Sequence, residues 1–306
     1  MPIVLEVHPG RSVPLGLPLV EQLFLLSRPA NALLPLLLLT AGFYAALGGF
    51  EQPSLDFYNL CISAFLLHAA FTVFNDVADR TIDADNNVRT IITLGTKTQR
   101  LRIAWGAAVL LVAAILIVAT LPPAVTIVVL CMTVVAFGYN QRPLQFSRRP
   151  LASIISLGLL YGFLPFFAGY FVVSPQVPYE WVAFASLWMV GRISLSLLKD
   201  FKDEDGDARH GKQTFLLRYG HGATLHLSTW LCAISYVGIT AILVLQARTL
   251  LLMVVVVVAA LVVGVAYSLL RQRTMMAELA TWRSVDAVVK QQIIIDGMFI
   301  VWLMLL

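Results

Sequence analysis

Long apolar segments alternate with short charged clusters along the whole chain. About nine of these segments reach the length of roughly twenty residues that a helix needs to cross the hydrocarbon core of a bilayer, and they lie at 24–48, 55–74, 99–120, 123–141, 151–173, 179–198, 223–245, 249–270 and 286–306. Pro122 and Pro123 divide the third segment from the fourth, because proline lacks the amide donor that a continuous helix requires. The pattern predicts an all-α membrane protein with about nine transmembrane helices in one bundle.

Composition supports a single membrane-embedded domain. Of the 306 residues, 59% are hydrophobic and 12% are charged, and the mean hydropathy is +0.84, whereas about 25% of residues are charged in soluble proteins. No polar linker divides the chain, so we expect one domain over 1–306. Residues 1–20 are expected to form a cytoplasmic tail without the features of a cleaved signal peptide. The cysteines lie singly within apolar segments, which argues against zinc and disulfides.

The distribution of basic residues predicts the orientation in the membrane. When the segments are threaded alternately through the bilayer, one side receives all but one of the 21 Lys and Arg residues, the exception being Arg248. Cytoplasmic loops carry such an excess, so we expect this side and the N-terminus to be cytoplasmic. The chain is therefore expected to be an integral multi-pass protein whose long, charged loops face the cytoplasm.

Two acidic clusters stand at the ends of the second and sixth segments, on the predicted cytoplasmic side. The first runs from Asn75 to Asp83 and the second from Lys199 to Asp207. Both carry aspartates at i, i+3 and i+7, positions that share one face of a helix; these residues are Asp76, Asp79 and Asp83, and Asp200, Asp203 and Asp207. Clustered carboxylates repel one another next to lipid, so we expect the two clusters to share a cation.

Magnesium is the ion that suits these clusters. It prefers oxygen ligands and usually combines one or two carboxylates with water and substrate phosphates. Two facing aspartate clusters therefore predict a diphosphate held by more than one Mg2+ ion. A calcium loop is excluded, because loops that start at Asp83 or Asp203 lack the glycine and the glutamate that such a loop needs at its sixth and twelfth positions.

Basic residues surround both clusters and together favour an anionic ligand with several charges. They are Arg80, Arg89, Lys97, Lys199, Lys202, Arg209 and Lys212, with Arg142, Arg148 and Arg149 in the intervening loop. For each residue singly, binding of lipid phosphates or control of membrane topology is an equally good explanation. We expect no nucleic acid partner, and we leave the oligomeric state open.

The two acidic clusters also match the pattern of a known family. Asn75-Asp76-x-x-Asp79-x-x-x-Asp83 and Asp200-x-x-Asp203-x-x-Gly206-Asp207 resemble the two signature motifs of the UbiA superfamily of intramembrane prenyltransferases. The stretch from Lys199 through Gly211-Lys212-Gln213-Thr214 looks closest to branches that include the homogentisate and chlorophyll-type enzymes. Arg28-Pro29 with Asn31 and Pro35 is similar to the family's opening segment, and Tyr139-Asn140-x-x-Pro143-Leu144 with Arg148 resembles one of its loops.

This resemblance implies helices around a central cavity with cytoplasmic caps, and Mg2+-dependent transfer of a prenyl group from a polyprenyl diphosphate to an acceptor, expected to be an aromatic ring. It implies catalytic roles for Asp76, Asp79, Asp200 and Asp203, and Mg2+ binding by these four together with Asp83 and Asp207. The expected substrate-binding residues are Asn31, Asn75, Arg80, Tyr139, Arg148, Arg192, Lys199, Lys202 and Lys212. A dry cavity would protect the carbocation left when the diphosphate departs.

Polar and aromatic residues inside the apolar segments are further candidates. His68, with Thr72 and Asn75, forms a stripe toward the first cluster, and we expect it either to orient or deprotonate the acceptor or to bond a neighbouring helix. Arg192 is expected to pair with an aspartate of the second cluster or with phosphate. Asp296 has Lys290 as its expected partner. Aromatic faces that would stabilise a carbocation are those of Tyr139, Tyr161, Phe163 and Trp188.

Two alternatives use the same features. A terpene cyclase of the same superfamily would ionise the same diphosphate and capture the cation with an internal double bond, so incubation with prenyl diphosphate alone separates it from a transferase. An ion-coupled transporter would also place acids within the membrane. Transporter acids usually lie near the bilayer midplane at broken helices, whereas these aspartates follow the apolar segments among basic residues, which favours prenyl transfer.

Overall fold

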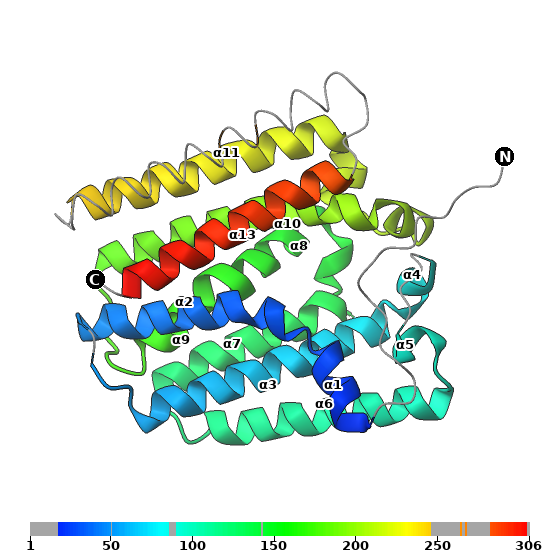
Figure 1. The fold of residues 1–306 in the computed structure, drawn as a ribbon, viewed down its shortest axis with the longest axis horizontal. Coiled ribbons are helices and arrows are strands. Elements are labelled where there is room, and N and C mark those ends of the chain that lie inside the picture. Colours follow the sequence, from blue (N-terminus) through cyan, green and yellow to red (C-terminus); the bar gives the residue numbers. More distant parts are fainter. Residues whose placement is uncertain are drawn as a thin grey trace.

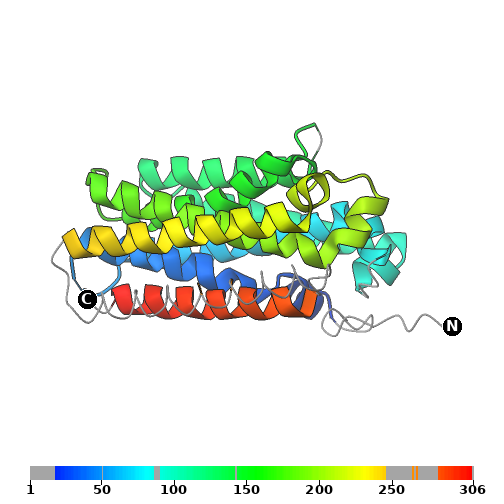
Figure 2. The same ribbon diagram turned by 90° about the horizontal axis from the view of Figure 1, so that it is seen from above.

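The computed structural model describes residues 18–49, 51–85, 90–141, 143–245, 264, 267 and 282–304. In this part of the chain, long helices run side by side along the long axis of a single bundle (Figures 1 and 2). They are α2 (Pro29–Leu47), α3 (Leu55–Ala78), α6 (Lys97–Val118), α7 (Pro123–Asn140), α10 (Tyr179–Arg209), α11 (Phe215–Leu245) and α13 (Trp282–Met304). The shorter elements are α1 (Leu19–Leu26), α4 (Arg80–Asp85), α5 (Ile91–Leu94), η1 (Phe146–Arg148), α8 (Pro150–Gly158), η2 (Leu159–Phe163) and α9 (Leu164–Tyr170).

The observed helices confirm the predicted all-α membrane architecture. Within the described ranges, 7 helical stretches are long and apolar enough to cross a membrane, and they coincide with the first seven predicted segments. The last predicted segment, 286–306, overlaps α13. The predicted segment 249–270 lies almost entirely outside the described residues, as do the tail residues 1–17.

The first predicted segment, 24–48, is divided into two helices. α1 ends at Leu26 and α2 begins at Pro29, and Arg28 between them has φ 51° and ψ 62°, in the left-handed region. Proline disfavours the helical conformation in the residue before it, and Pro29 follows Arg28 at this break. The resulting turn brings the Arg28 side chain to Asp76 of α3.

A π-helical turn interrupts the fifth segment. It comprises Leu159–Phe163 and joins α8 to α9, and such turns are frequent at functional sites. Within it, Gly162 lies against α10, where an added Cβ would come 2.8 Å from the Cα atom of Met189. Glycine therefore allows the turn to pack against α10, while Leu160 and Tyr161 of the same turn line a cavity on its other side.

Aromatic side chains fill the end of the bundle where α2 ends and α3 begins. Phe43, Phe57 and Phe166 belong to one buried apolar cluster, and the ring centroids of Phe43 and Phe57 are 4.3 Å apart. α2 and α9 approach closely here, because a Cβ on Gly42 would lie only 1.9 Å from the Phe166 carbonyl oxygen. The close approach requires glycine, and it leaves this end of the bundle filled.

A buried ion pair connects α10 with α13. The guanidinium of Arg192 pairs with the Asp296 carboxylate, and the Tyr236 hydroxyl of α11 donates a hydrogen bond of 2.5 Å to Asp296 Oδ1. These contacts correct two expectations. Arg192 does not pair with the second acidic cluster, and Lys290 pairs with Asp286 of its own helix rather than with Asp296. The nearest carboxylate to an intramembrane arginine comes from a segment distant in the sequence, which spacing alone does not reveal.

The Asp296→Ala variant is expected to destabilise the fold by about 3 kcal/mol, because it leaves the Arg192 charge buried without its partner. Thermal unfolding in detergent, followed by circular dichroism, measures this loss. Asp286→Ala is the matched control on the same helix: its partner Lys290 is 70% exposed, and exposed pairs contribute little. Replacing Arg192 by Met and Asp296 by Leu together should recover most of the stability. An unchanged melting temperature for Asp296→Ala would contradict a stabilising role for the pair.

Candidate active site

The two acidic clusters meet at one end of the bundle. The first lies at the end of α3 and in α4, and the second lies in the last turns of α10. Lys212 joins the two clusters, and a second contact lies just outside them. The Lys212 ammonium is 3.4 Å from Asp79 Oδ2 and 3.2 Å from Asp207 Oδ1, and His210 Nε2 is 2.7 Å from Asp85 Oδ2. Lys212 therefore places a positive charge between the two clusters.

The charge on Lys212 is set by opposing effects. Burial by itself lowers the pKa of the ammonium group, but the carboxylates of Asp79 and Asp207 raise it by more, so that the net pKa is raised. The side chain is only 11% exposed, which keeps its interactions with both carboxylates weakly screened. Lys212 is therefore a fixed positive charge between the two clusters.

The aspartates of the first cluster do not share one unbroken helix. α3 ends at Ala78, Asp79 follows with φ −91° and ψ 9°, and Asp83 belongs to α4. The Asp83 amide still donates a hydrogen bond of 2.8 Å to the Asp79 carbonyl, so the interruption is a local bend. The second cluster lies on the continuous helix α10, as its spacing predicts.

Two partners of the first cluster come from other helices. Arg28, at the turn before α2, forms an ion pair with Asp76, which is buried with 3% of its surface exposed. Asn140, at the end of α7, donates a side-chain hydrogen bond to Asn75 Oδ1. These contacts connect the first cluster with the start of α2 and the end of α7. The sequence analysis did not predict either pairing. For Arg28, the available signal was the following Pro29, which predicts a helix break. For Asn140, it was the resemblance of Tyr139-Asn140 to a family motif.

A long cavity runs from this polar end into the apolar bundle. Its polar end is lined by Arg28, Asn75, Tyr139, Asn140 and Lys199. Beyond them the lining comes from α2, α3, α7, α8, η2 and α9 and is mostly aliphatic. The cavity therefore combines a cationic and amide-rich mouth with an interior suited to a hydrocarbon chain.

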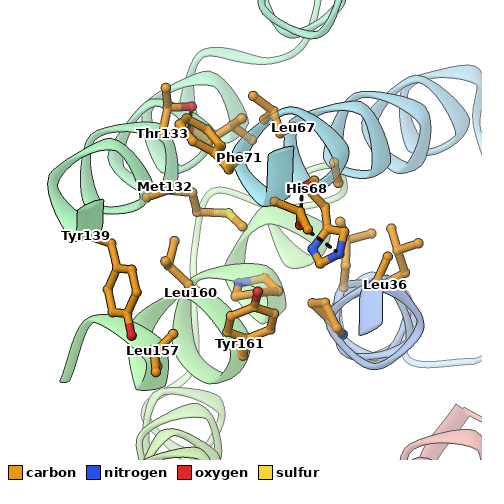
Figure 3. Close-up of a pocket in the computed structure, with 18 of the residues that line it drawn as sticks. Leu36, Leu67, His68, Phe71, Met132, Thr133, Tyr139, Leu157, Leu160 and Tyr161 are labelled. Carbon is orange, nitrogen blue, oxygen red and sulfur yellow. Dashed lines mark hydrogen bonds between the residues drawn. The ribbon is translucent and has the colours of Figure 1, made fainter. Parts of the chain in front are cut away.

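Side chains from several helices converge in the middle of the cavity (Figure 3). His68 of α3 and Tyr161 of η2 face each other there, with ring centroids 6.4 Å apart in an edge-to-face arrangement. His68 Nε2 lies 3.5 Å from the Thr72 hydroxyl, which itself donates to the His68 carbonyl over 2.8 Å. Met132 and Leu160 complete this layer. His68 is thus an ionisable side chain in a part of the cavity that is lined mostly by apolar residues.

The structure brings several predicted site residues to the polar end. Asn75, Tyr139 and Lys199 line the cavity, and Asp76, Asp79 and Asp207 carry the contacts described above. Asp200, Lys202 and Asp203 are half-buried on α10 just below Asp207, and Asp83 is half-buried on α4.

Other predicted site residues lie elsewhere. Asn31 is exposed and does not itself line the cavity, although its neighbours Ala32 and Pro35 do. Arg80 and Arg148 are exposed and do not line the cavity. Arg192 pairs with Asp296 of α13, and its expected role in substrate binding stays a prediction. Arg89 and Arg142 fall outside the described residues.

The donor set at the polar end fits a metal shared with a ligand better than a metal held by protein alone. In the described ranges, no three His, Cys, Asp or Glu side chains come close enough together to hold an ion. Carboxylates nevertheless face one another from α3 and α10, with one ammonium between Asp79 and Asp207. Hard oxygen donors that leave several ligand positions unfilled suit Mg2+, which completes its shell with water and substrate phosphates.

Sequence comparison identifies two proteins of the same name that are similar to this chain. Digeranylgeranylglyceryl phosphate synthase of Methanoregula boonei is 25% identical over 203 residues, which is 66% of this chain and 69% of that protein. The synthase of the same name from Methanoculleus marisnigri is 28% identical over 203 residues, with the same coverage.

Solved structures share the fold over nearly the whole chain. A UbiA homolog from Archaeoglobus fulgidus bound to GPP and Mg2+ matches with a TM-score of 0.70 and 19% identity, covering 92% of this chain and 98% of that one. An apo UbiA homolog from Aeropyrum pernix K1 gives 0.66 and 18%, covering 90% and 98%. The model of the UbiA prenyltransferase family matches residues 35–285. The chain therefore belongs to the UbiA prenyltransferase family, and it is an integral multi-pass membrane protein.

Proposed function

We propose that the protein transfers a prenyl group from a prenyl diphosphate to an acceptor within the membrane, with Mg2+ at the acidic end of the cavity. One observation carries the proposal: two acidic clusters, joined by Lys212, stand at the mouth of a long apolar cavity. Such a site has a place for a charged head group and a place for a hydrocarbon tail. The Archaeoglobus fulgidus homologs bound to GPP or DMAPP together with Mg2+ support it.

The aspartates of both clusters would hold Mg2+ together with the diphosphate; they are Asp76, Asp79, Asp83, Asp200, Asp203 and Asp207. When bound, Mg2+ stabilises the negative charge that builds on the diphosphate as its bond to carbon breaks. Lys212 and Lys199 supply fixed positive charge to the same oxygens. Arg28 would do so once the diphosphate competes with Asp76 for its guanidinium. Of these three cations, Lys199 and Arg28 line the cavity mouth.

The reaction breaks the bond between the allylic carbon and the diphosphate oxygen, and the diphosphate leaves with the bonding electrons. The acceptor then bonds to that carbon and loses a proton. Apolar walls exclude the water that would otherwise capture the carbocation. The aromatic ring of Tyr161 offers a face toward the positive charge. One continuous cavity thus contains groups that would bind the diphosphate, assist its departure and protect the carbocation from water.

The acceptor is proposed to be an aromatic ring, with a glyceryl phosphate as the second candidate. The second candidate follows from the name of the two related synthases, which refers to a glyceryl phosphate. A terpene cyclase would need no acceptor. Mass spectrometry of products from prenyl diphosphate alone, with phenolic acceptors, and with glycerol phosphate lipids separates the three outcomes.

The orientation and domain organisation belong to the same proposal. The acidic end of the bundle is proposed to face the cytoplasm, because the basic residues gather on that side. Residues 1–306 are proposed to act as one domain. The acids of the two clusters lie at the ends of helices rather than at broken helices near the midplane, which favours prenyl transfer over an ion-coupled transporter.

Asp76→Ala and Asp200→Ala are each expected to lower turnover by about 100-fold or more while the protein stays folded, because each removes charge that acts on the developing diphosphate anion. Excess chelator should abolish turnover in the wild type. Asp56→Ala, at the opposite end of α3, is the matched control and should keep wild-type activity. Full activity of either cluster variant, or of the wild type in chelator, would contradict the metal mechanism.

His68→Gln is expected to lower the rate of acceptor prenylation by about tenfold or more, because a positioned proton acceptor contributes at least that much. Mg2+-dependent release of diphosphate without acceptor should change little, since His68 lies about 12 Å along α3 from Asp76. Comparing the two rates separates proton transfer from ionisation. Equal losses in both assays, or no loss in either, would show that His68 only packs against Tyr161.

A further inference from the structure

We propose that Leu39, Leu60, Val129 and Ala168 form a floor that limits the prenyl donor to about three to four isoprene units. This assignment rests on the proposed prenyl transfer and adds the length of the donor and the residues that set it. The four residues come from four different helices, α2, α3, α7 and α9, and all of them line the far part of the cavity.

The depth of the cavity follows from the positions that line it on each helix. On α3 the lining residues run from Asn75 at the mouth to Leu60, and fifteen helical steps of about 1.5 Å make roughly 22 Å. On α2 they run from Arg28 to Leu39, and on α7 from Asn140 to Val129. Eleven steps on each of these helices make roughly 16 Å. The last lining residue therefore lies roughly 16 Å from the mouth on α2 and α7 and roughly 22 Å from it on α3.

This depth corresponds to a short prenyl chain. One isoprene unit adds four carbon–carbon bonds of about 1.5 Å to the chain, or roughly 5 Å when extended. A cavity of roughly 16 to 22 Å thus holds about three to four units. A donor of six or more units would extend roughly 10 Å past the floor, so it would have to fold back or leave the cavity sideways.

The floor is closed from below by tightly packed side chains and backbone. Leu60 has 0% and Leu39 has 2% of its surface exposed, and both belong to the same buried cluster as Val129 and Ala168. Beneath Leu39, α2 touches α9 so closely that a Cβ on Gly169 would lie 1.8 Å from the Leu39 carbonyl oxygen. The contacting rings of Phe43 and Phe57, tilted at 38° to each other, follow. A prenyl chain therefore cannot extend between α2 and α9 without displacing backbone.

Ala64 offers a direct way to change the depth. It lines the cavity one helical turn above Leu60 on the same face of α3. A larger side chain at Ala64 would fill the last part of the cavity, whereas a smaller one at Leu60 would deepen it. The two substitutions act in opposite directions on length, which separates a change of length preference from general damage.

The experiment compares turnover of geranyl, farnesyl, geranylgeranyl and hexaprenyl diphosphates with one fixed acceptor. The wild type should prefer the farnesyl and geranylgeranyl donors. Ala64→Leu should lower the ratio of geranylgeranyl to geranyl turnover by about tenfold, because a hydrophobic pocket discriminates by about that factor for a group that no longer fits. Leu60→Ala should raise hexaprenyl turnover relative to geranyl turnover.

Ile62→Ala, on the lipid-facing side of α3 with 52% exposure, is the matched control and should leave all ratios unchanged. Circular dichroism confirms that each variant is folded, and Ala64→Leu decides the matter if Leu60→Ala fails to fold. Unchanged length ratios in a folded, active Ala64→Leu variant overturn the floor. A wild type that transfers no prenyl group from any donor instead overturns the proposed function, so the two failures are distinguishable.

Discussion

Electrostatic repulsion between two acidic clusters is the constraint on which the site depends. Six aspartates at the membrane boundary are unfavourable unless cations compensate them. Lys212 meets this need between Asp79 and Asp207, and Arg28 meets it at Asp76. Lys212 and Arg28 each come from a segment other than the one that carries Asp79 and Asp76. These ion pairs therefore help to hold the ends of α2, α3 and α10 together. The same aspartates can bind the Mg2+ ions of a metal-bound diphosphate, which would then balance their charge in place of Lys212 and Arg28.

Local departures from regular helix place the remaining groups. The left-handed Arg28 ends α1 and turns its guanidinium toward the acidic end. The π-turn after Gly158 brings Tyr161 into the cavity opposite His68. The first departure directly precedes Pro29, and proline disfavours the helical conformation in the residue before it. An intramembrane site thus gains its polar and aromatic lining without leaving backbone groups exposed to lipid.

Much of the architecture is readable from the sequence, because apolar segments of bilayer length leave few alternatives to helices. The observed spans follow the predicted ones, and the pairing of two aspartate motifs anticipates their meeting in space. Side-chain partners are harder to predict. Lys212 is adjacent to the second cluster in sequence, yet only the fold brings it to Asp79. Arg192 and Asp296 lie far apart in the chain, so their pairing required the packing of α13 against α10.

The most direct test of the central claim is calorimetric binding of an unreactive prenyl thiodiphosphate to the purified protein, with Mg2+ and with excess chelator. The two acidic clusters are predicted to bind the analogue tightly only when Mg2+ is present, because carboxylates alone repel a diphosphate. Asp200→Ala should weaken that binding by about tenfold or more. Equal affinity with Mg2+ and with chelator would contradict the account that the clusters form one magnesium–diphosphate site.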